Sequence, residues 1–218
     1  MIALYQAAAA DILVPTAEAL RYAGQGAEPL SQELAELFSS CMAEFLDCAA
    51  YRAASLEVEL APCPPFRGGM RHSRQGEWRD TIYLGDLRIM SKSLFFHLMG
   101  CDRAILFCAT VGGELDRLFL RYGRANPSRA LLLDAIGSAA IEAWCDTLTA
   151  GWIEALRPRG LSLRPRFSPG YGDFPLQHQK EILSLLSAAQ ATGVSVTKSL
   201  MLTPQKSVTA VIGISEKI

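Results

Sequence analysis

The stretch RAILFCATVGGELDRLFLRYG, residues 103–123, is the most regular part of this sequence. It opens with a continuous apolar run, Ala104 to Thr110, which is typical of a strand buried on both faces. Two glycines then predict a tight turn. A helix follows with Glu114 and Asp116 in its first turn, where acidic side chains interact favourably with the helix dipole. We therefore expect a central strand that leads directly into a helix.

Both helices and strands are predicted on either side of this stretch. Upstream, the pattern predicts a helix capped by Ser31, a strand over 55–61, a hairpin turning at Gly85-Asp86 and a short helix capped by Ser91 or Ser93. Downstream, it predicts a long helix over 126–156, an amphipathic helix over 176–189, and two strands separated by a turn at Thr203-Pro204. Because strands and helices do not alternate regularly, we expect a mixed α/β or α+β domain and not a doubly wound parallel sheet.

The chain is long enough for one large domain with a sizeable core, since it has 218 residues. We expect residues 1–218 to form a single domain. Within it, 1–52 are predicted to be a helical N-terminal part, and 53–218 an α/β core that carries a loop over 164–175.

Composition excludes several classes of protein. The formal net charge is −1, so no basic excess points to nucleic acid. The N-terminus has no positively charged region of a secretory signal, and no apolar run is long enough to cross a membrane, so we expect a cytoplasmic protein. None of the six cysteines belongs to a CxxC pair. Most lie in apolar surroundings, which favours buried free thiols and no metal site.

Familiar catalytic motifs are not found. The turn in TVGGELD lacks the lysine of a phosphate-binding loop and has no GxGxxG spacing, so it is best interpreted as a tight turn. The three histidines, His72, His97 and His178, have no metal-ligand spacing. Four arginines lie between residues 67 and 79, and the acidic residues beside them favour a solvated loop over an anion site.

The stretch RPRFSPGYGDFP, residues 164–175, contains the best candidate binding residues. Its prolines restrict the main chain, and Gly170 would let a ligand approach the backbone closely. Arg166 offers a planar guanidinium that matches a carboxylate, and Tyr171 offers an aromatic face and a hydroxyl. These residue types are compatible with a site for a small ligand with an amino-acid or nucleoside part, and also with a structural connector.

The segment RFSPGY, residues 166–171, resembles the RxxPGY motif of the activation domain of cobalamin-dependent methionine synthase. The similarity extends over about residues 91–214. In the region after the motif, the matching residues follow in the order Thr197, Ser199, Pro204, Ser207 and Val208. The sequence differs directly after Tyr171, where Gly172 stands in place of the family's usual proline.

The resemblance implies an α+β fold with a mixed or antiparallel sheet flanked by helices. It also implies a freestanding activation-domain protein that binds S-adenosylmethionine and supports reductive methylation of cob(II)alamin on a separate methionine synthase. Arg166 would bind the methionine carboxylate, Ser168 and Gly170 would present backbone groups to the adenosyl part, and Tyr171 would line the pocket near the methyl donor. Glu142 would lie near the cationic end of the ligand. The resemblance implies no catalytic residue in this chain.

The expected partner is a cobalamin-dependent methionine synthase or another corrinoid protein, because this sequence has no DxHxxG motif for holding cobalamin itself. A reductant protein could also take part. The alternative is a non-catalytic module that docks onto a corrinoid protein with a degenerate ligand pocket. A small-molecule methyltransferase is a third interpretation, and the absence of a general base near the motif counts against it. Whether the chain is an enzyme stays open at this point.

Overall fold

A five-stranded antiparallel sheet forms the centre of the computed structural model, which describes residues 1–26, 29–61 and 81–216. In sheet order its strands are β1 (Ala3–Ala7), β2 (Tyr51–Glu59), β5 (Arg103–Thr110), β9 (Ser207–Glu216) and β6 (Leu161–Leu163). The apolar run in residues 103–123 is therefore the middle strand, as predicted. The predicted α+β class, with a sheet flanked by helices, is confirmed.

Strand β5 separates two hydrophobic cores, because its successive side chains point to opposite faces of the sheet. Ile105, Phe107 and Ala109 pack into the core on one face. Leu106 and Cys108 pack into the core on the other face. All but Ile105 are completely buried. A continuous apolar sequence is thus required for a strand that is covered on both faces.

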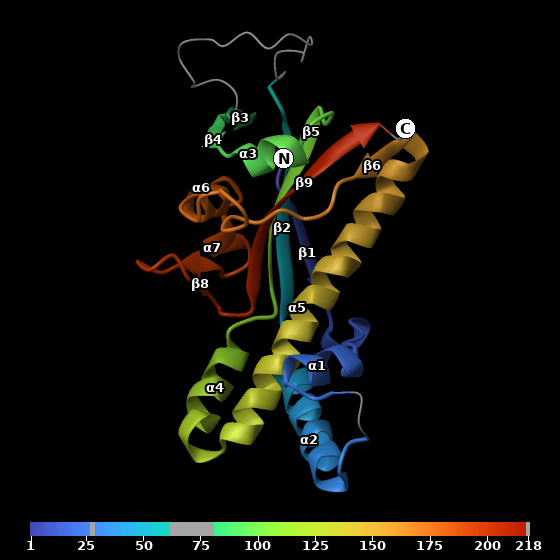
Figure 1. Cartoon of the computed structure of the whole chain (residues 1–218), viewed down its shortest axis with the longest axis vertical. Helices are drawn as coiled ribbons and strands as arrows, with labels where there is room; N and C mark the ends of the chain where they lie inside the picture. The colour runs from blue at the N-terminus through green and yellow to red at the C-terminus, as the bar shows by residue number, and fades with distance from the viewer. Residues whose placement is uncertain (27–28, 62–80, 217–218) are drawn as a thin grey trace.

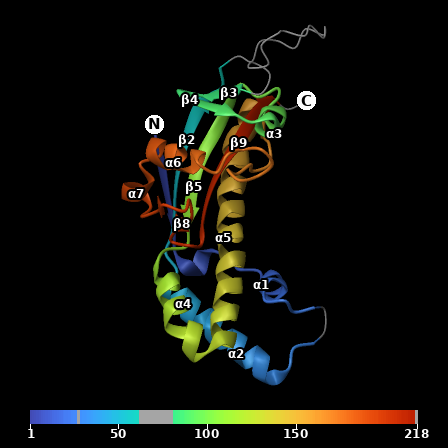
Figure 2. The ribbon, with the colours of Figure 1, turned by 60° about the vertical axis from the view of Figure 1, so that its left-hand side comes forward.

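The long helix α5 covers the first face of the sheet and extends well beyond it (Figures 1 and 2). Shorter helices pack around its lower half. The helices on this side are α1 (Thr16–Tyr22), α2 (Gln32–Cys48), α4 (Glu114–Ala125) and α5 (Pro127–Leu156), with the short 3-10 turns η1 (Ala9–Asp11) and η2 (Arg157–Arg159). Ser31 caps α2 as predicted, since its hydroxyl accepts a hydrogen bond from the Leu34 N–H at 3.2 Å.

Smaller elements cover the opposite face, which Figure 2 shows on the other side of the sheet from α5. They are the hairpin β3 (Thr81–Leu84) and β4 (Leu87–Met90), α3 (Lys92–His97), α6 (His178–Leu185), α7 (Ala188–Ala191), and the pair β7 (Ser195–Val196) and β8 (Leu202–Thr203). The predicted amphipathic helix over 176–189 is broken in two, because Ser187 takes the left-handed conformation at φ 48°.

The N-terminal part differs from the expectation of a purely helical segment, because its first element is the edge strand β1. Its sequence, ALYQA, precedes a run of alanines that favours helix by intrinsic propensity. The strand forms because its backbone pairs with the exposed edge of β2, from Ala3 opposite Ser55 to Ala7 opposite Tyr51. A long-range contact of this kind overrides local propensity. The predicted arginine-rich loop, with His72, lies outside the described residues.

Helix α5 contains two glycines in different surroundings. Gly137 lies where α4 crosses α5, and a Cβ built there would be 2.4 Å from Leu115 Cδ2 and 3.1 Å from Lys206 Cγ. Gly151, five residues before the end of the helix at Leu156, has no atom within 4 Å of such a Cβ. The small residue at position 137 therefore allows the close approach of α4 and Lys206.

The substitutions Gly137→Ala and Gly151→Ala should consequently have opposite effects. Alanine normally stabilises a helix interior by about 0.5–1 kcal/mol relative to glycine, and we expect this gain for Gly151→Ala. Gly137→Ala should lower the free energy of unfolding by about 1–3 kcal/mol, since the methyl group overpacks the contact with Leu115. Urea unfolding of both variants tests this, and equal stabilisation by the two would contradict the packing described here.

Candidate ligand-binding site

The loop over 164–175 is attached to the free edge of β9. Strand β6 pairs only with the last residues of β9. Beyond it, the Arg164 N–H donates to the Gly213 carbonyl at 2.8 Å, and Phe167 and Val211 exchange two main-chain hydrogen bonds of 2.9 Å. The backbone on both sides of Arg166 is thus fixed by the sheet, and Arg166 is presented towards α5.

A tight turn follows at Gly170. This residue has φ 98°, a conformation that residues with a Cβ rarely adopt. The Gly170 N–H donates to the Phe174 carbonyl at 2.8 Å, and the Tyr171 N–H donates to the Ser168 carbonyl at 3.1 Å. The RxxPGY segment therefore closes on itself, and glycine is needed for the shape of the turn.

Aromatic rings anchor this turn to the sheet. Phe174 is buried and stacks on Phe167, with ring centroids 6.3 Å apart. The His97 ring lies 4.8 Å from Phe167, and its Nε2–H donates to the Pro165 carbonyl at 2.8 Å. The His178 ring packs on Phe174, with ring centroids 5.8 Å apart. Both histidines therefore support the loop as packing residues.

The departure from the family motif at Gly172 has a structural role. Gly172 has φ 55°, which proline cannot adopt, and a Cβ there would be 2.5 Å from the Ser93 hydroxyl. The next residue, Asp173, caps helix α3. Its carboxylate accepts hydrogen bonds from the Ser91 hydroxyl at 2.7 Å and from the N–H groups of Lys92 and Ser93, both at 2.9 Å. The loop is in this way tied to the start of α3.

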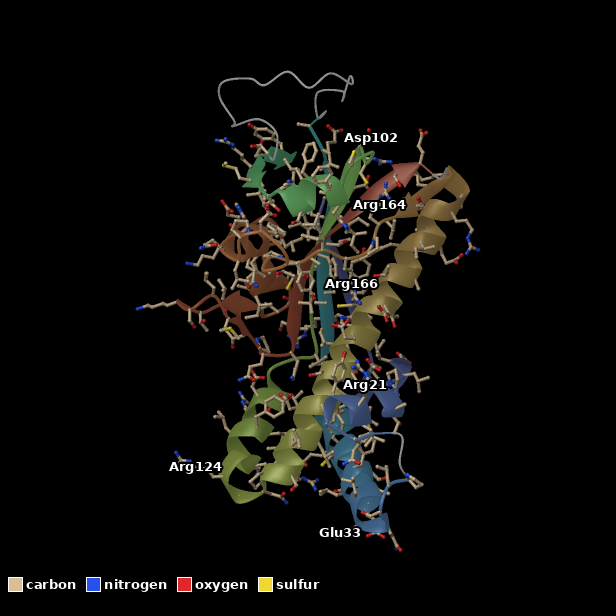
Figure 3. All side chains as sticks on the ribbon, in the orientation of Figure 1. Arg21, Glu33, Asp102, Arg124, Arg164 and Arg166 are labelled. Carbon is tan, nitrogen blue, oxygen red and sulfur yellow. The ribbon has the colours of Figure 1, made fainter. Side chains whose placement is uncertain are left out.

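A pocket of about 300 Å³ lies between the loop, helix α5 and β9. This volume is at the lower end of the range for small-molecule sites. Its lining consists of Glu142, Pro165, Arg166, Ser168, Tyr171 and Val208. Tyr171 is 60% exposed and forms an open wall of the pocket. In Figure 3, Arg166 lies beside the middle of α5, and Arg164 lies two residues earlier in the same segment.

The guanidinium of Arg166 is held by two carboxylates of α5. Its Nη2 donates to Glu142 Oε2 and to Asp146 Oδ1, each at 2.9 Å. Glu142 and Asp146 are four residues apart, so they share one face of the helix. Without a ligand, the arginine expected to bind a ligand carboxylate is thus paired with side chains of this chain.

The surroundings of Arg166 maintain its charge. Burial opposes ionisation, but Cys145, Glu142 and Asp146 together raise the pKa of Arg166 above its usual value. Burial raises the pKa of the Cys145 thiol to about 12 despite the nearby guanidinium. At neutral pH the cysteine is therefore neutral, and it serves as packing between α5 and the sheet.

The structure brings together most of the residues that the sequence singled out. Four of the five candidates, Glu142, Arg166, Ser168 and Tyr171, line one pocket, although Glu142 is more than twenty residues away from the loop. Gly170 shapes the turn and is not part of the lining. Asp146 was missed. Its position, one helical turn after Glu142, is the signal that could have indicated it.

No group of three or more candidate metal ligands occurs within residues 1–26, 29–61 and 81–216. In the same ranges, no helix has the length and apolar character needed to cross a bilayer. Cys41, Cys108 and Cys145 are buried free thiols, as the sequence predicted for most of the cysteines.

Comparisons with known proteins place this architecture in a defined structural class. The sequence matches no family model and no curated protein. The structure is an α+β domain built on a five-stranded antiparallel sheet, and this is the fold of the MetH reactivation domain. One matching structure is the crystal structure of that domain bound to AdoHcy, with a TM-score of 0.66 and 14% sequence identity. It covers 98% of this chain and 78% of the other. The predicted fold resemblance is thereby confirmed.

The cap formed by Asp173 predicts a pH-dependent contribution to stability. Hydrogen bonds from Ser91, Ser93 and Lys92 lower the pKa of Asp173 well below its usual value. The pKa of an aspartate in the unfolded chain is about 4, and a carboxyl group with a lower pKa in the folded protein stabilises the fold fully above that pH. This contribution is lost as the pH falls towards the pKa of the group in the folded protein. Asp173→Asn should therefore lower the melting temperature by about 2–4 °C at pH 7 and by a smaller amount at pH 3, where only part of the contribution is lost.

Thermal unfolding followed by circular dichroism at the two pH values measures this effect. Asp47→Asn, which removes one exposed carboxylate from α2, is the matched control. A difference between wild type and Asp173→Asn that stays constant from pH 7 to pH 3 would rule out the charged cap.

Proposed function

We propose that this protein binds S-adenosylmethionine in the pocket between α5 and the RxxPGY loop. By binding this ligand, the protein supports reductive methylation of cob(II)alamin on a separate cobalamin-dependent methionine synthase. The observation that carries the proposal is the pocket itself. Arg166, Glu142, Ser168 and Tyr171, which the sequence resemblance singled out, line one cavity in a domain with the fold of the MetH reactivation domain.

The chemistry of the lining fits an amino-acid zwitterion with an attached nucleoside. Arg166 would bind the carboxylate, and Glu142 would face the cationic part of the ligand. Tyr171 offers an exposed aromatic ring on which a flat group can stack. Ser168 and the turn at Gly170 would supply backbone groups. Bound there, S-adenosylmethionine would supply the methyl group, and this chain would hold and orient it while cobalt chemistry takes place on the partner.

A specific observation also favours the alternative, a docking module without a ligand. Arg166 already forms ion pairs with Glu142 and Asp146, so these three side chains could join the loop to α5 and bind nothing. The two functions differ in one measurable property, the affinity for S-adenosylmethionine.

Isothermal titration calorimetry with S-adenosylmethionine is the direct test. We expect saturable binding to the wild-type protein and a loss of about tenfold or more for Arg166→Ala, because a partly buried charged hydrogen bond to the ligand carboxylate is removed. Arg164→Ala is the matched control. Arg164 is in the same loop, but its guanidinium donates to the Met99 carbonyl and does not line the pocket.

Circular dichroism should accompany the titration, since Arg166→Ala leaves two carboxylates without their partner. No heat from the wild-type protein at millimolar ligand would exclude ligand binding and leave the docking module. Equal losses for Arg164→Ala and Arg166→Ala would assign the effect to loop stability.

A reconstituted assay tests the second half of the proposal. A cobalamin-dependent methionine synthase without its own activation domain would be inactivated to the cob(II)alamin form and mixed with this protein, S-adenosylmethionine and a chemical reductant. We expect recovery of the methylcobalamin absorption spectrum only when all components are present, and little recovery with Arg166→Ala. Full recovery without this protein would disprove a role in reactivation.

A further inference from the structure

Asp146 is a charged residue that the sequence did not identify, and it pairs with Arg166, which lines the pocket. We infer that Asp146, acting with Glu142, makes the site selective for a cationic sulfonium ligand over the neutral thioether of the same shape, that is, for S-adenosylmethionine over AdoHcy. This inference rests on the proposed function and adds a specificity-determining residue to it.

Two carboxylates and one guanidinium leave the site with an excess negative charge. Glu142 and Asp146 both pair with Nη2 of Arg166, so a single positive charge is shared between two negative ones. The side chains of Glu142 and Asp146 are 45% and 73% exposed.

The charged groups of α1 do not cancel this excess. On α1, Arg21 pairs with Glu18. Tyr22 of the same helix lies close enough to Glu142 for the carboxylate to raise its pKa, although burial is the larger cause. The phenol is therefore neutral at pH 7. Within the lining of the pocket, Glu142 and Arg166 are the charged side chains. The sum of Arg166, Glu142 and Asp146 is one negative charge.

The geometry allows a ligand to bind without displacing either carboxylate. Both ion pairs use the same nitrogen of Arg166, Nη2. A guanidinium carries five N–H groups on three nitrogens, so Nη1 and Nε are not used by Glu142 or Asp146. Nη1 or Nε can therefore donate a hydrogen bond to a ligand carboxylate while Asp146 and Glu142 stay in place to attract a positive charge.

The two ligands isolate this effect. S-adenosylmethionine and AdoHcy share the same ammonium, carboxylate and nucleoside, and they differ in the methyl group and positive charge at sulfur. Any change in the common contacts affects both dissociation constants alike. The ratio of the two constants therefore reports the interaction of the site with the sulfonium charge, which falls with distance and with salt.

The experiment measures both dissociation constants by calorimetry for wild type, Asp146→Asn, Asp146→Glu and Glu154→Gln. Asp146→Asn should reduce the preference for S-adenosylmethionine over AdoHcy by about threefold or more, and Asp146→Glu should restore it. Glu154→Gln removes the same charge from α5 two turns further along, where Glu154 pairs with Arg157, and should leave the ratio unchanged. The preference of the wild-type protein should weaken in high salt.

The outcomes separate the two proposals. An unchanged ratio in Asp146→Asn, or tighter binding of S-adenosylmethionine by this variant, would overturn the inference while the proposed function stands. Tighter binding would show Asp146 to be a competitor for Arg166. Failure of the wild-type protein to bind either ligand would overturn the proposed function and the inference with it.

Discussion

The burial of β5 on both faces is the constraint on which the rest of the structure depends. Its backbone is paired with β2 on one edge and β9 on the other, and its side chains enter two separate cores. Each face must therefore be covered by other elements. Helix α5 covers one face, and the hairpin with α3, α6 and α7 covers the other. The candidate site lies where these two layers meet at the edge of the sheet.

The edge of β9 beyond β6 explains how segments that are far apart in the sequence form one pocket. Strand β6 is too short to pair with the whole of β9, and the loop continues its course through main-chain hydrogen bonds at Gly213 and Val211. The backbone of Arg166 lies between these hydrogen bonds. Its guanidinium reaches α5 and donates hydrogen bonds to Glu142 and Asp146. The position of the guanidinium thus follows from backbone pairing on one side and from the spacing of carboxylates along a helix on the other.

The region after Tyr171 shows how a departure from a family motif can be structural. Gly172 brings the backbone against Ser93, and Asp173 caps the first turn of α3. Phe174 fills the core beneath the turn. The residues after the motif fix the loop to α3, while Arg166 and Tyr171 of the motif line the pocket.

The sequence by itself determined the local elements and the residue types of the site. Strand β5, the Ser31 cap, the hairpin at Gly85-Asp86 and helix α5 follow from apolar periodicity and turn chemistry, which act over a few residues. Only the tertiary structure decided the edge strand β1, the break at Ser187 and the pairing of Arg166 with Asp146. Each of these depends on a partner far away in the chain or on the fit of neighbouring elements. Local spacing can point to Asp146 as a neighbour of Glu142, but it cannot show which distant side chain the two residues contact.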